Sequence, residues 1–262
     1  MNKYLAGVVA FACMFGLSNV WASPAEEAMK EYDQALSRTP NLENGKKVYK
    51  ICAVCHTPEG WGRVDGTYPQ LAGQLNTVII KQLADIRARN RDNPTMRPFT
   101  SSRLLGGVQE IADVAAYIAQ LPMTPTNGRG SGMDLEHGEK LYVDNCVECH
   151  SEHGEGNRKE HIPMIQGQHY RYLMRQFEWI RTGRRRNADS SMVKQIRRFT
   201  ARDVAAVMDY VSRLVPPPGK LAEQGWVNPD FPSYSRANLP RDRGNQMPLP
   251  GVPPRYRPGQ YR

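Results

Sequence analysis

The chain has 262 residues, which is too long for one small domain and suits two. Its 22 Gly and 20 Pro favour small, loop-rich units over a single large core. A formal charge of +9 favours anionic partners, but by itself it does not distinguish an acidic protein from a membrane surface or nucleic acid.

The first 22 residues have the pattern of a secretory signal. Lys3 supplies a positive charge, an apolar run extends from Tyr4 to about Leu17, and small residues precede a cleavage point after Ala22. An uncleaved anchor is the alternative, but the run is shorter than the roughly 18 residues that a spanning helix needs. Cys13 follows a poor lipoprotein signal. Since no later segment is long and apolar, we expect a soluble periplasmic protein without a transmembrane segment.

An internal repeat organises the rest of the chain. The motif Cys-x-x-Cys-His occurs twice, at an offset of 146 − 52 = 94, with these residues: Cys52, Cys55, His56, Cys146, Cys149 and His150. A Pro-x-x-x-Gly-Gln loop recurs at the same offset, at 69–74 and 163–168. We therefore divide the mature chain into a first domain (41–122), a linker (123–133), a second domain (134–215) and a basic Pro-rich tail (216–262).

Each domain is predicted to be mostly helical. Apolar residues recur at helical spacing at 78–86 and 172–180, and most clearly in the closing segments 111–118 and 204–211. Gly- and Pro-rich stretches separate these segments, and no alternating run favours a sheet. The predicted fold class is therefore all-α: two tandem helical domains followed by an irregular tail.

The repeated motif indicates covalent haem attachment. Two thiols at this spacing reach the two vinyl groups of one porphyrin, and the following histidine is held over the iron. A thioredoxin-like pair needs a strand–helix context that is not visible, and it leaves His56 and His150 unexplained. A zinc site built from both cysteine pairs is disfavoured because some ninety residues separate the pairs. A disulfide within each pair is disfavoured because it closes only a small loop and so adds little stability. We therefore predict two covalently bound haem c groups.

A sixth iron ligand is expected from Met96 and Met192. They lie 96 − 56 = 40 and 192 − 150 = 42 residues beyond the two histidines, in polar surroundings that argue against core packing. Surface methionines are the alternative. His/Met ligation raises the reduction potential and closes the iron, which suits electron transfer. Pro69 and Pro163 are candidates to offer their carbonyls to the second ring nitrogen of each histidine, although simple turn chemistry explains these prolines equally well.

The remaining histidines fall in the second domain without counterparts in the first. We expect them at the surface or in loops: His137, His153, His161 and His169.

These motifs resemble the dihaem cytochrome c4 family, with two class I cytochrome c domains in tandem, over about 41–215 of the chain. The resemblance implies thioether attachment at the four motif cysteines, ligation by His56 with Met96 and by His150 with Met192, and pseudo-twofold domains with haems close enough to exchange electrons. It also implies a periplasmic shuttle that often serves terminal oxidases. The tail and the strong basicity depart from the pattern and bring the free-shuttle role into question.

Basic residues cluster around Met192, and they are expected to border one edge of the second haem: Arg181, Arg184, Arg185, Arg186, Lys194, Arg197 and Arg198. Such a rim can steer an acidic partner. The alternative is a solvated helix face in which some arginines bind haem propionates. Nucleic acid is not expected as a partner of a secreted haem protein. The tail keeps many aromatic residues, so we expect it either along another subunit or along its own domains, with disorder as the alternative.

Two functions compete at this point. The favoured one is an electron carrier between redox proteins, such as a terminal oxidase, a quinol-oxidising complex or a dehydrogenase, either free or held in a stable hetero-complex through the tail. The other is a dihaem oxidoreductase, peroxidase-like or thiosulfate-oxidising, which needs an iron with an exchangeable distal ligand. Methionine at both matched positions argues against the enzyme.

Overall fold

The computed structural model of the chain describes residues 22–232. Within these residues the protein is helical and has no strand, only two isolated bridges, which confirms the predicted all-α class. The first half contains α1 (Pro24–Leu36), α2 (Leu42–His56), α3 (Asn76–Arg87), α4 (Arg97–Thr100) and α5 (Val108–Gln120). The second half contains α6 (Leu135–Asn145), α7 (Val147–His150), α8 (Tyr170–Arg181), α9 (Ser190–Ile196), α10 (Ala201–Arg213) and a 3-10 turn (Pro218–Lys220). No helix in the described range has the length and apolar character needed to cross a bilayer.

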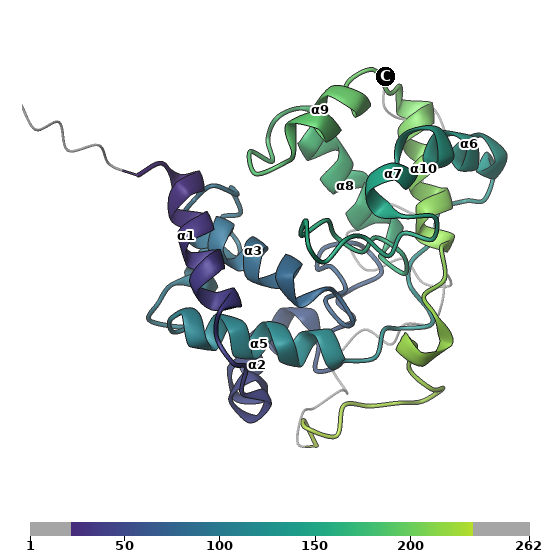
Figure 1. The fold of residues 1–262 in the computed structure, drawn as a ribbon. Coiled ribbons are helices and arrows are strands. Elements are labelled where there is room, and N and C mark those ends of the chain that lie inside the picture. Colours follow the sequence, from purple (N-terminus) through teal and green to yellow (C-terminus); the bar gives the residue numbers. More distant parts are fainter. Residues whose placement is uncertain (1–21, 233–262) are drawn as a thin grey trace, which may run out of the picture.

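The two halves form two domains that lie side by side (Figure 1). In each, the first helix of the repeat unit packs on the closing helix: α2, which carries the first haem motif, packs on α5, and α6, which ends just before the second motif, packs on α10. A glycine allows each crossing. A Cβ on Gly45 would lie 2.2 Å from the carbonyl oxygen of Asp113, and one on Gly138 would lie 2.3 Å from that of Ala206. The repeated Gly45 and Gly138 are therefore required by backbone contact rather than by turns.

The closing helices α5 and α10 contain the predicted segments 111–118 and 204–211 and extend beyond both. Thr200 caps α10 through a reciprocal pair of hydrogen bonds with Asp203, the arrangement known as a capping box. The apolar face of α5 is buried at Ile111, Val114 and Ile118, in the hydrophobic core of the first domain. The equivalent face of α10 forms the core of the second domain. Burial of these two faces is what fixes each domain around its haem motif.

Helix α1 was not predicted. It begins at a capping box between Ser23 and Glu26, and it buries Ala28, Tyr32 and Ala35 against the first domain, where it packs on α3 and α5. In Figure 1 it lies across these two helices. Among residues 22–232, the first domain therefore has a cover with no counterpart on the second.

The start of the tail is ordered on the first domain. Residues 221–232, which we call the C-terminal strap, return beneath this domain (Figure 1). Trp226 and Phe231 join its apolar cluster. The buried Asn228 donates to the carbonyl of Pro58 at 2.6 Å and to the hydroxyl of Tyr117 at 3.0 Å. This part of the tail lies along the chain's own first domain, which was one of the two predicted positions. Residues 233–262, with the predicted aromatic and basic positions beyond the strap, lie outside the described residues.

Two reciprocal clasps join the domains. The side chain of Gln168 accepts from the N–H of Gln70 at 3.0 Å and donates to its carbonyl at 2.9 Å. Gln74 makes the same pair with the backbone of Met164, at 3.0 Å and 2.8 Å. The partners are related by the internal repeat, since 168 − 74 = 94 and 164 − 70 = 94. The same pair of side-chain-to-backbone hydrogen bonds thus occurs twice across the domain interface, at positions related by the repeat.

Candidate haem sites

Each candidate haem site begins where a helix ends in histidine. His56 is the last residue of α2, and Thr57 then turns the chain with a φ of 67°. Positive φ is uncommon for a non-glycine residue, so this turn needs support. Tyr49 gives that support because its hydroxyl donates to the Thr57 carbonyl at 2.9 Å. The two cysteines of the motif, Cys52 and Cys55, lie on the same helix as His56.

The second domain repeats this arrangement with one difference. His150 ends α7, Ser151 has a φ of 67°, and the hydroxyl of Tyr142 donates to the Ser151 carbonyl at 2.6 Å. Here, however, the helix is interrupted at Cys146, which separates α6 from α7. The histidine end of the motif is therefore preserved while the helix leading to it has changed.

Both histidine rings are oriented by a proline carbonyl. Nδ1 of His56 lies 3.0 Å from the carbonyl oxygen of Pro69, and Nδ1 of His150 lies 3.1 Å from that of Pro163. A carbonyl only accepts, so Nδ1 carries the hydrogen and Nε2 keeps a lone pair. Burial lowers the pKa of both histidines, which favours this neutral form. The predicted role of the two prolines is confirmed, and each ring is prepared to bind a metal through Nε2.

The four motif cysteines form no disulfide bond with one another. Burial, followed by the neighbouring cysteine, raises the pKa of Cys52 to about 12 and that of Cys146 to about 12. Redox-active Cys-x-x-Cys pairs have a lowered thiol pKa, because the thiolate is the nucleophile. Cys52 and Cys146 have the opposite property, which weighs against a thioredoxin-like function.

The donor set fits haem c in both domains. Cys52 and Cys55 lie on α2, whereas Cys146 lies at the junction of α6 and α7 and Cys149 lies within α7. In both domains two thiols are thus available for thioether bonds, and the imidazole that follows presents an oriented Nε2. Haem iron supplies a one-electron couple between its ferric and ferrous states. The protein side chains attach, orient and shield it.

The two expected methionine ligands occupy different local positions. Met96 caps the start of α4 and is half-buried. Met192 lies inside α9, where Asp189 accepts a hydrogen bond from its N–H at 3.1 Å. The structure brings Met192 into the same apolar cluster as Cys146, whereas the corresponding cluster of the first domain, as far as it is described, does not include Met96. The assignment of both as sixth ligands stays a prediction.

The Cytochrome c family model matches residues 42–122 and 135–214. Cytochrome c4 of Azotobacter vinelandii is 30% identical over 180 residues, covering 63% of this chain and 84% of the relative. The chain belongs to the dihaem cytochrome c4 family. It therefore binds two covalently attached haem c groups and carries electrons.

Two further comparisons extend this assignment. The crystal structure of reduced cytochrome c4 from Pseudomonas stutzeri superimposes with a TM-score of 0.60 at 26% identity, over 67% of this chain and all of that one. A thiosulfate dehydrogenase electron acceptor of Stutzerimonas stutzeri is 28% identical over 68% of this chain and 90% of its own length. The fold is thus that of cytochrome c4, and an electron acceptor is similar in sequence over most of its length.

His169 lies in the loop before α8, which is one of the two predicted positions, but it is not at the surface. This residue is 1% exposed and lies between the domains. Its Nε2 donates to the carbonyl of Trp61 at 2.7 Å, and its Nδ1 accepts from the N–H of Gly128 at 3.0 Å. His161 is also half-buried, with its ring 5.3 Å from that of Tyr32 on α1. Neither has a repeat counterpart, so no sequence signal marked them as contacts.

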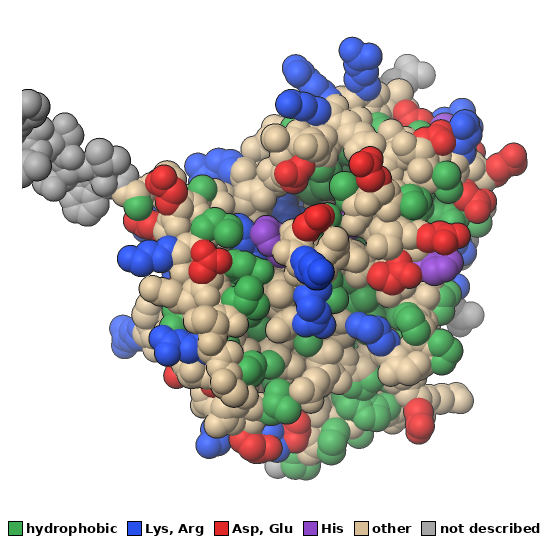
Figure 2. Space-filling model, viewed as in Figure 1, with side chains coloured by type: hydrophobic (Ala, Val, Ile, Leu, Met, Phe, Trp, Pro, Cys, Tyr) green, Lys and Arg blue, Asp and Glu red, His purple; other side chains and the backbone are tan. Residues whose placement is uncertain are grey.

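The basic cluster divides into two groups. Arg185 turns into the domain interface, where its guanidinium donates to Gln176 and Gln82 at 3.1 Å each, so it is not part of a docking surface. Arg181 pairs with Glu178. Five residues of the cluster remain exposed, and one of them, Arg186, donates to the carbonyl of Arg89 at 2.9 Å. We call the other four the α9 face: Arg184, Lys194, Arg197 and Arg198. Figure 2 shows Lys and Arg side chains gathered over this end of the molecule.

The surroundings of the exposed Cys149 differ from the predicted basic rim. The pKa of this thiol is raised by burial and by the negative charges of Glu148, Asp189 and Glu160. Acidic side chains therefore lie near Cys149, whereas basic residues gather at the α9 face.

Proposed function

We propose that this chain is a periplasmic carrier of single electrons rather than an enzyme. Its haems are attached through Cys52 and Cys55 with His56 as proximal ligand, and through the three equivalent residues that follow: Cys146, Cys149 and His150. Met96 and Met192 are the sixth ligands of the two irons. The observation that carries this proposal is the pair of histidines held at Nδ1 by Pro69 and Pro163, which leaves Nε2 of both rings available.

The chain has little chemistry to perform in this role. Buried histidines with fixed rings hold each iron in one geometry, so little reorganisation accompanies a change of charge. Methionine at the sixth position excludes water and small ligands from the iron. Secretion is consistent with the fold, because α1 is capped by Ser23, the first residue after the predicted cleavage point.

The α9 face suits a partner with an acidic docking surface. Exposed positive charges steer an anionic partner and speed encounter without requiring tight binding. A dehydrogenase is supported as the electron donor by the relative named as a thiosulfate dehydrogenase electron acceptor. A terminal oxidase is supported as a partner by a second relative, the cbb3-type oxidase subunit FixP of Bradyrhizobium diazoefficiens. A stable hetero-complex through the tail would use residues beyond the strap.

The alternative function is a dihaem oxidoreductase that oxidises thiosulfate or reduces peroxide. It is favoured by the likeness to a thiosulfate dehydrogenase structure from Marichromatium purpuratum, at 26% identity and a TM-score of 0.56 over 40% of that chain. Such an enzyme needs one iron with an exchangeable distal position. The carrier and the enzyme therefore differ in whether Met96 and Met192 both stay bound.

A spectroelectrochemical titration of the purified mature protein tests this difference. We expect two attached haems, both with the charge-transfer band that marks a Met–Fe(III) bond, and no response to cyanide or peroxide. Met96→Ala and Met192→Ala should each remove one haem's share of the band and make that iron bind cyanide. A wild-type haem that lacks the band or binds cyanide would contradict the carrier and support the enzyme.

A further inference from the structure

Each histidine that ends a haem motif is bonded to a peptide group whose other side faces the opposite domain. In the first domain, the carbonyl of Pro69 accepts a hydrogen bond from Nδ1 of His56 at 3.0 Å. The N–H of the same peptide group belongs to Gln70, and it donates to Oε1 of Gln168 in the second domain at 3.0 Å. One planar peptide group therefore joins the ring of His56 to a side chain of the other domain.

The second domain has the same arrangement in the opposite direction. The carbonyl of Pro163 accepts from Nδ1 of His150 at 3.1 Å. The N–H of that peptide group belongs to Met164, and it donates to Oε1 of Gln74 in the first domain at 3.0 Å. Each domain thus contributes one glutamine to the peptide group that holds the histidine of the other domain.

Neighbouring contacts fix the direction of both glutamine amides. Oε1 of Gln168 also accepts from the N–H of His169 at 3.0 Å. Oε1 of Gln74 likewise accepts from the N–H of Leu75 at 3.0 Å. Each amide nitrogen donates to a backbone carbonyl of the opposite domain. Because a flipped amide would set donors against donors, the oxygens are the atoms that receive the two peptide N–H groups.

A peptide group transmits the effect of a hydrogen bond from one side to the other. When its N–H donates, the group becomes more polarised and its carbonyl becomes a stronger acceptor. A stronger acceptor at Nδ1 makes the imidazole a more basic ligand through Nε2. A more basic ligand stabilises ferric iron more than ferrous iron, because the ferric ion carries the higher charge.

We propose that Gln74 and Gln168 are crossed positioning residues: each polarises the peptide group that holds the histidine of the other domain, and thereby lowers the reduction potential of the haem attached there. The proposal rests on iron ligation by His56 and His150. Glutamines that served only to join the domains would hold them together without setting either potential.

The two copies differ in burial. Gln168 and Gln70 are 8% and 3% exposed, whereas Gln74 is half-buried. A hydrogen bond is stronger where water is excluded, because the local dielectric constant is lower. The effect on the first haem is therefore the larger of the two.

Replacing each glutamine separately tests the crossed effect. In Gln168→Leu, we expect the equilibrium constant for reduction of the first haem to rise roughly threefold, which is about 28 mV for a one-electron couple, and that of the second haem to stay unchanged. In Gln74→Leu, the second haem should shift in the same direction by less, and the first should not shift. A redox titration followed by NMR separates the haems, because the hyperfine-shifted signals of each are assigned through residues of its own domain.

A second readout reports on the histidine itself. In the ferrous form of Gln168→Leu, the Nδ1–H proton of His56 should move upfield because its hydrogen bond is weaker, and that of His150 should not move. The domains should stay joined in this variant. The side chain of Gln70 still donates to the carbonyl of Gly167 at 2.8 Å and accepts from the N–H of Thr124 at 2.7 Å.

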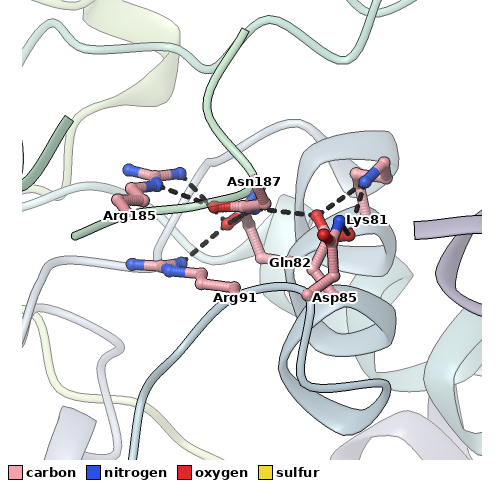
Figure 3. Close-up of polar contacts among 7 residues, drawn as sticks. Lys81, Gln82, Asp85, Arg91, Arg185 and Asn187 are labelled. Carbon is pink, nitrogen blue, oxygen red and sulfur yellow. Dashed lines mark hydrogen bonds and ion pairs between the residues drawn. The ribbon is translucent and has the colours of Figure 1, made fainter. Parts of the chain in front are cut away.

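Asn187 provides a matched control at the same interface. Its side chain reaches from the second domain to α3, where it donates to Gln82 at 3.2 Å and to Asp85 at 2.8 Å (Figure 3). Like Gln74, it is a half-buried neutral amide, but both hydrogen bonds that it donates go to side chains rather than to a peptide group that holds a histidine. Asn187→Ala should therefore shift neither potential.

Several outcomes would overturn the proposal. A shift of the haem in the substituted residue's own domain would do so, as would equal shifts of both haems or an equal shift in Asn187→Ala. A fall in potential would show a loosened interface instead, because entering water stabilises the charged ferric form.

A pyridine haemochrome assay keeps this proposal apart from the one on which it rests. A wild type without two attached haems would contradict the proposed function, whereas two haems with unshifted potentials in both variants would contradict only the crossed effect. If Gln168→Leu does not accumulate, Gln74→Leu decides the question, since its position is only half-buried.

Discussion

The two domains have the same haem-binding end but are covered very differently. In the first, α1 and the C-terminal strap lie over the core, and Cys55 is half-buried. In the second, no described segment takes the place of either cover, and Cys149 is exposed. The two copies have thus kept the same haem-attachment motif, but they differ in how far other segments of the chain cover it. We infer that the first haem is the shielded one and that electrons enter or leave through the second.

The largest expected effect tests whether the strap stabilises the first domain. Phe231→Ala removes a buried ring that packs at 5.9 Å from Tyr49, and it should cost about 3–5 kcal/mol of the free energy of unfolding. Val227→Ala in the same segment is the control, because Val227 is exposed and should change little. Denaturant unfolding followed by fluorescence and haem absorbance measures both. Equal stability of the two variants would show that the strap is not part of the folded core.

A smaller effect concerns the contact that joins the domains at His169. Burial lowers the pKa of His169, and the carbonyl of Trp61 and the charge of Asp65 only partly oppose this. The folded pKa therefore lies below the unfolded value of about 6.5, so the unfolded chain binds more protons in the window between them. Stability should be full above about pH 6.5 and fall as the pH drops below it, by about 1–3 kcal/mol once the bond from Gly128 is lost.

Denaturant unfolding between about pH 7.5 and pH 5 measures this dependence. His169→Gln offers an acceptor and a donor that do not titrate, so it should remove most of the fall. His153→Gln, at an exposed position, should behave as wild type. If His169→Gln retains the full pH dependence, another group is responsible and the two domains are not joined through this ring.

The smallest effect tests the second domain as the entry point. We expect the double variant Arg197→Gln, Arg198→Gln on the α9 face to react several-fold more slowly with hexacyanoferrate(III) at low salt and to lose much of its salt dependence. The control pair in the first domain is Lys47→Gln, Lys50→Gln, which removes the same charge from α2. Stopped-flow absorbance gives the rates. Equal slowing by the two pairs would mean that overall charge, and not the α9 face, steers the reagent.

The parts that could be predicted from the sequence are those that occur twice. The repeat pointed to the motif cysteines and histidines, and the apolar spacing of 111–118 and 204–211 predicted α5 and α10. The alignment of the two loops suggested Pro69 and Pro163 as acceptors, which the structure confirms. A pattern that occurs twice at one offset rarely arises by chance. It also indicates that the matched residues occupy equivalent positions in the two domains.

The parts that could not be predicted occur once. The Ser23–Glu26 capping box was visible, but it followed a signal peptide and was interpreted only as the start of the mature chain. Trp226 and Phe231 pack without helical periodicity, so no pattern marked the strap. Arg185 stood in a run of arginines that suggested a solvated face. Its direction is set by tertiary contacts with Gln82 and Gln176, one of which belongs to the other domain.

The two glutamine clasps suggest how the two-domain chain evolved. Each copy gives a glutamine side chain to the other's backbone and receives the same in return, which is how two identical subunits meet across a twofold axis. Such a contact is available to a lone ancestral domain as a homodimer. Fusion of two genes then needed only a connecting peptide, since the surface that holds the halves together was already self-complementary.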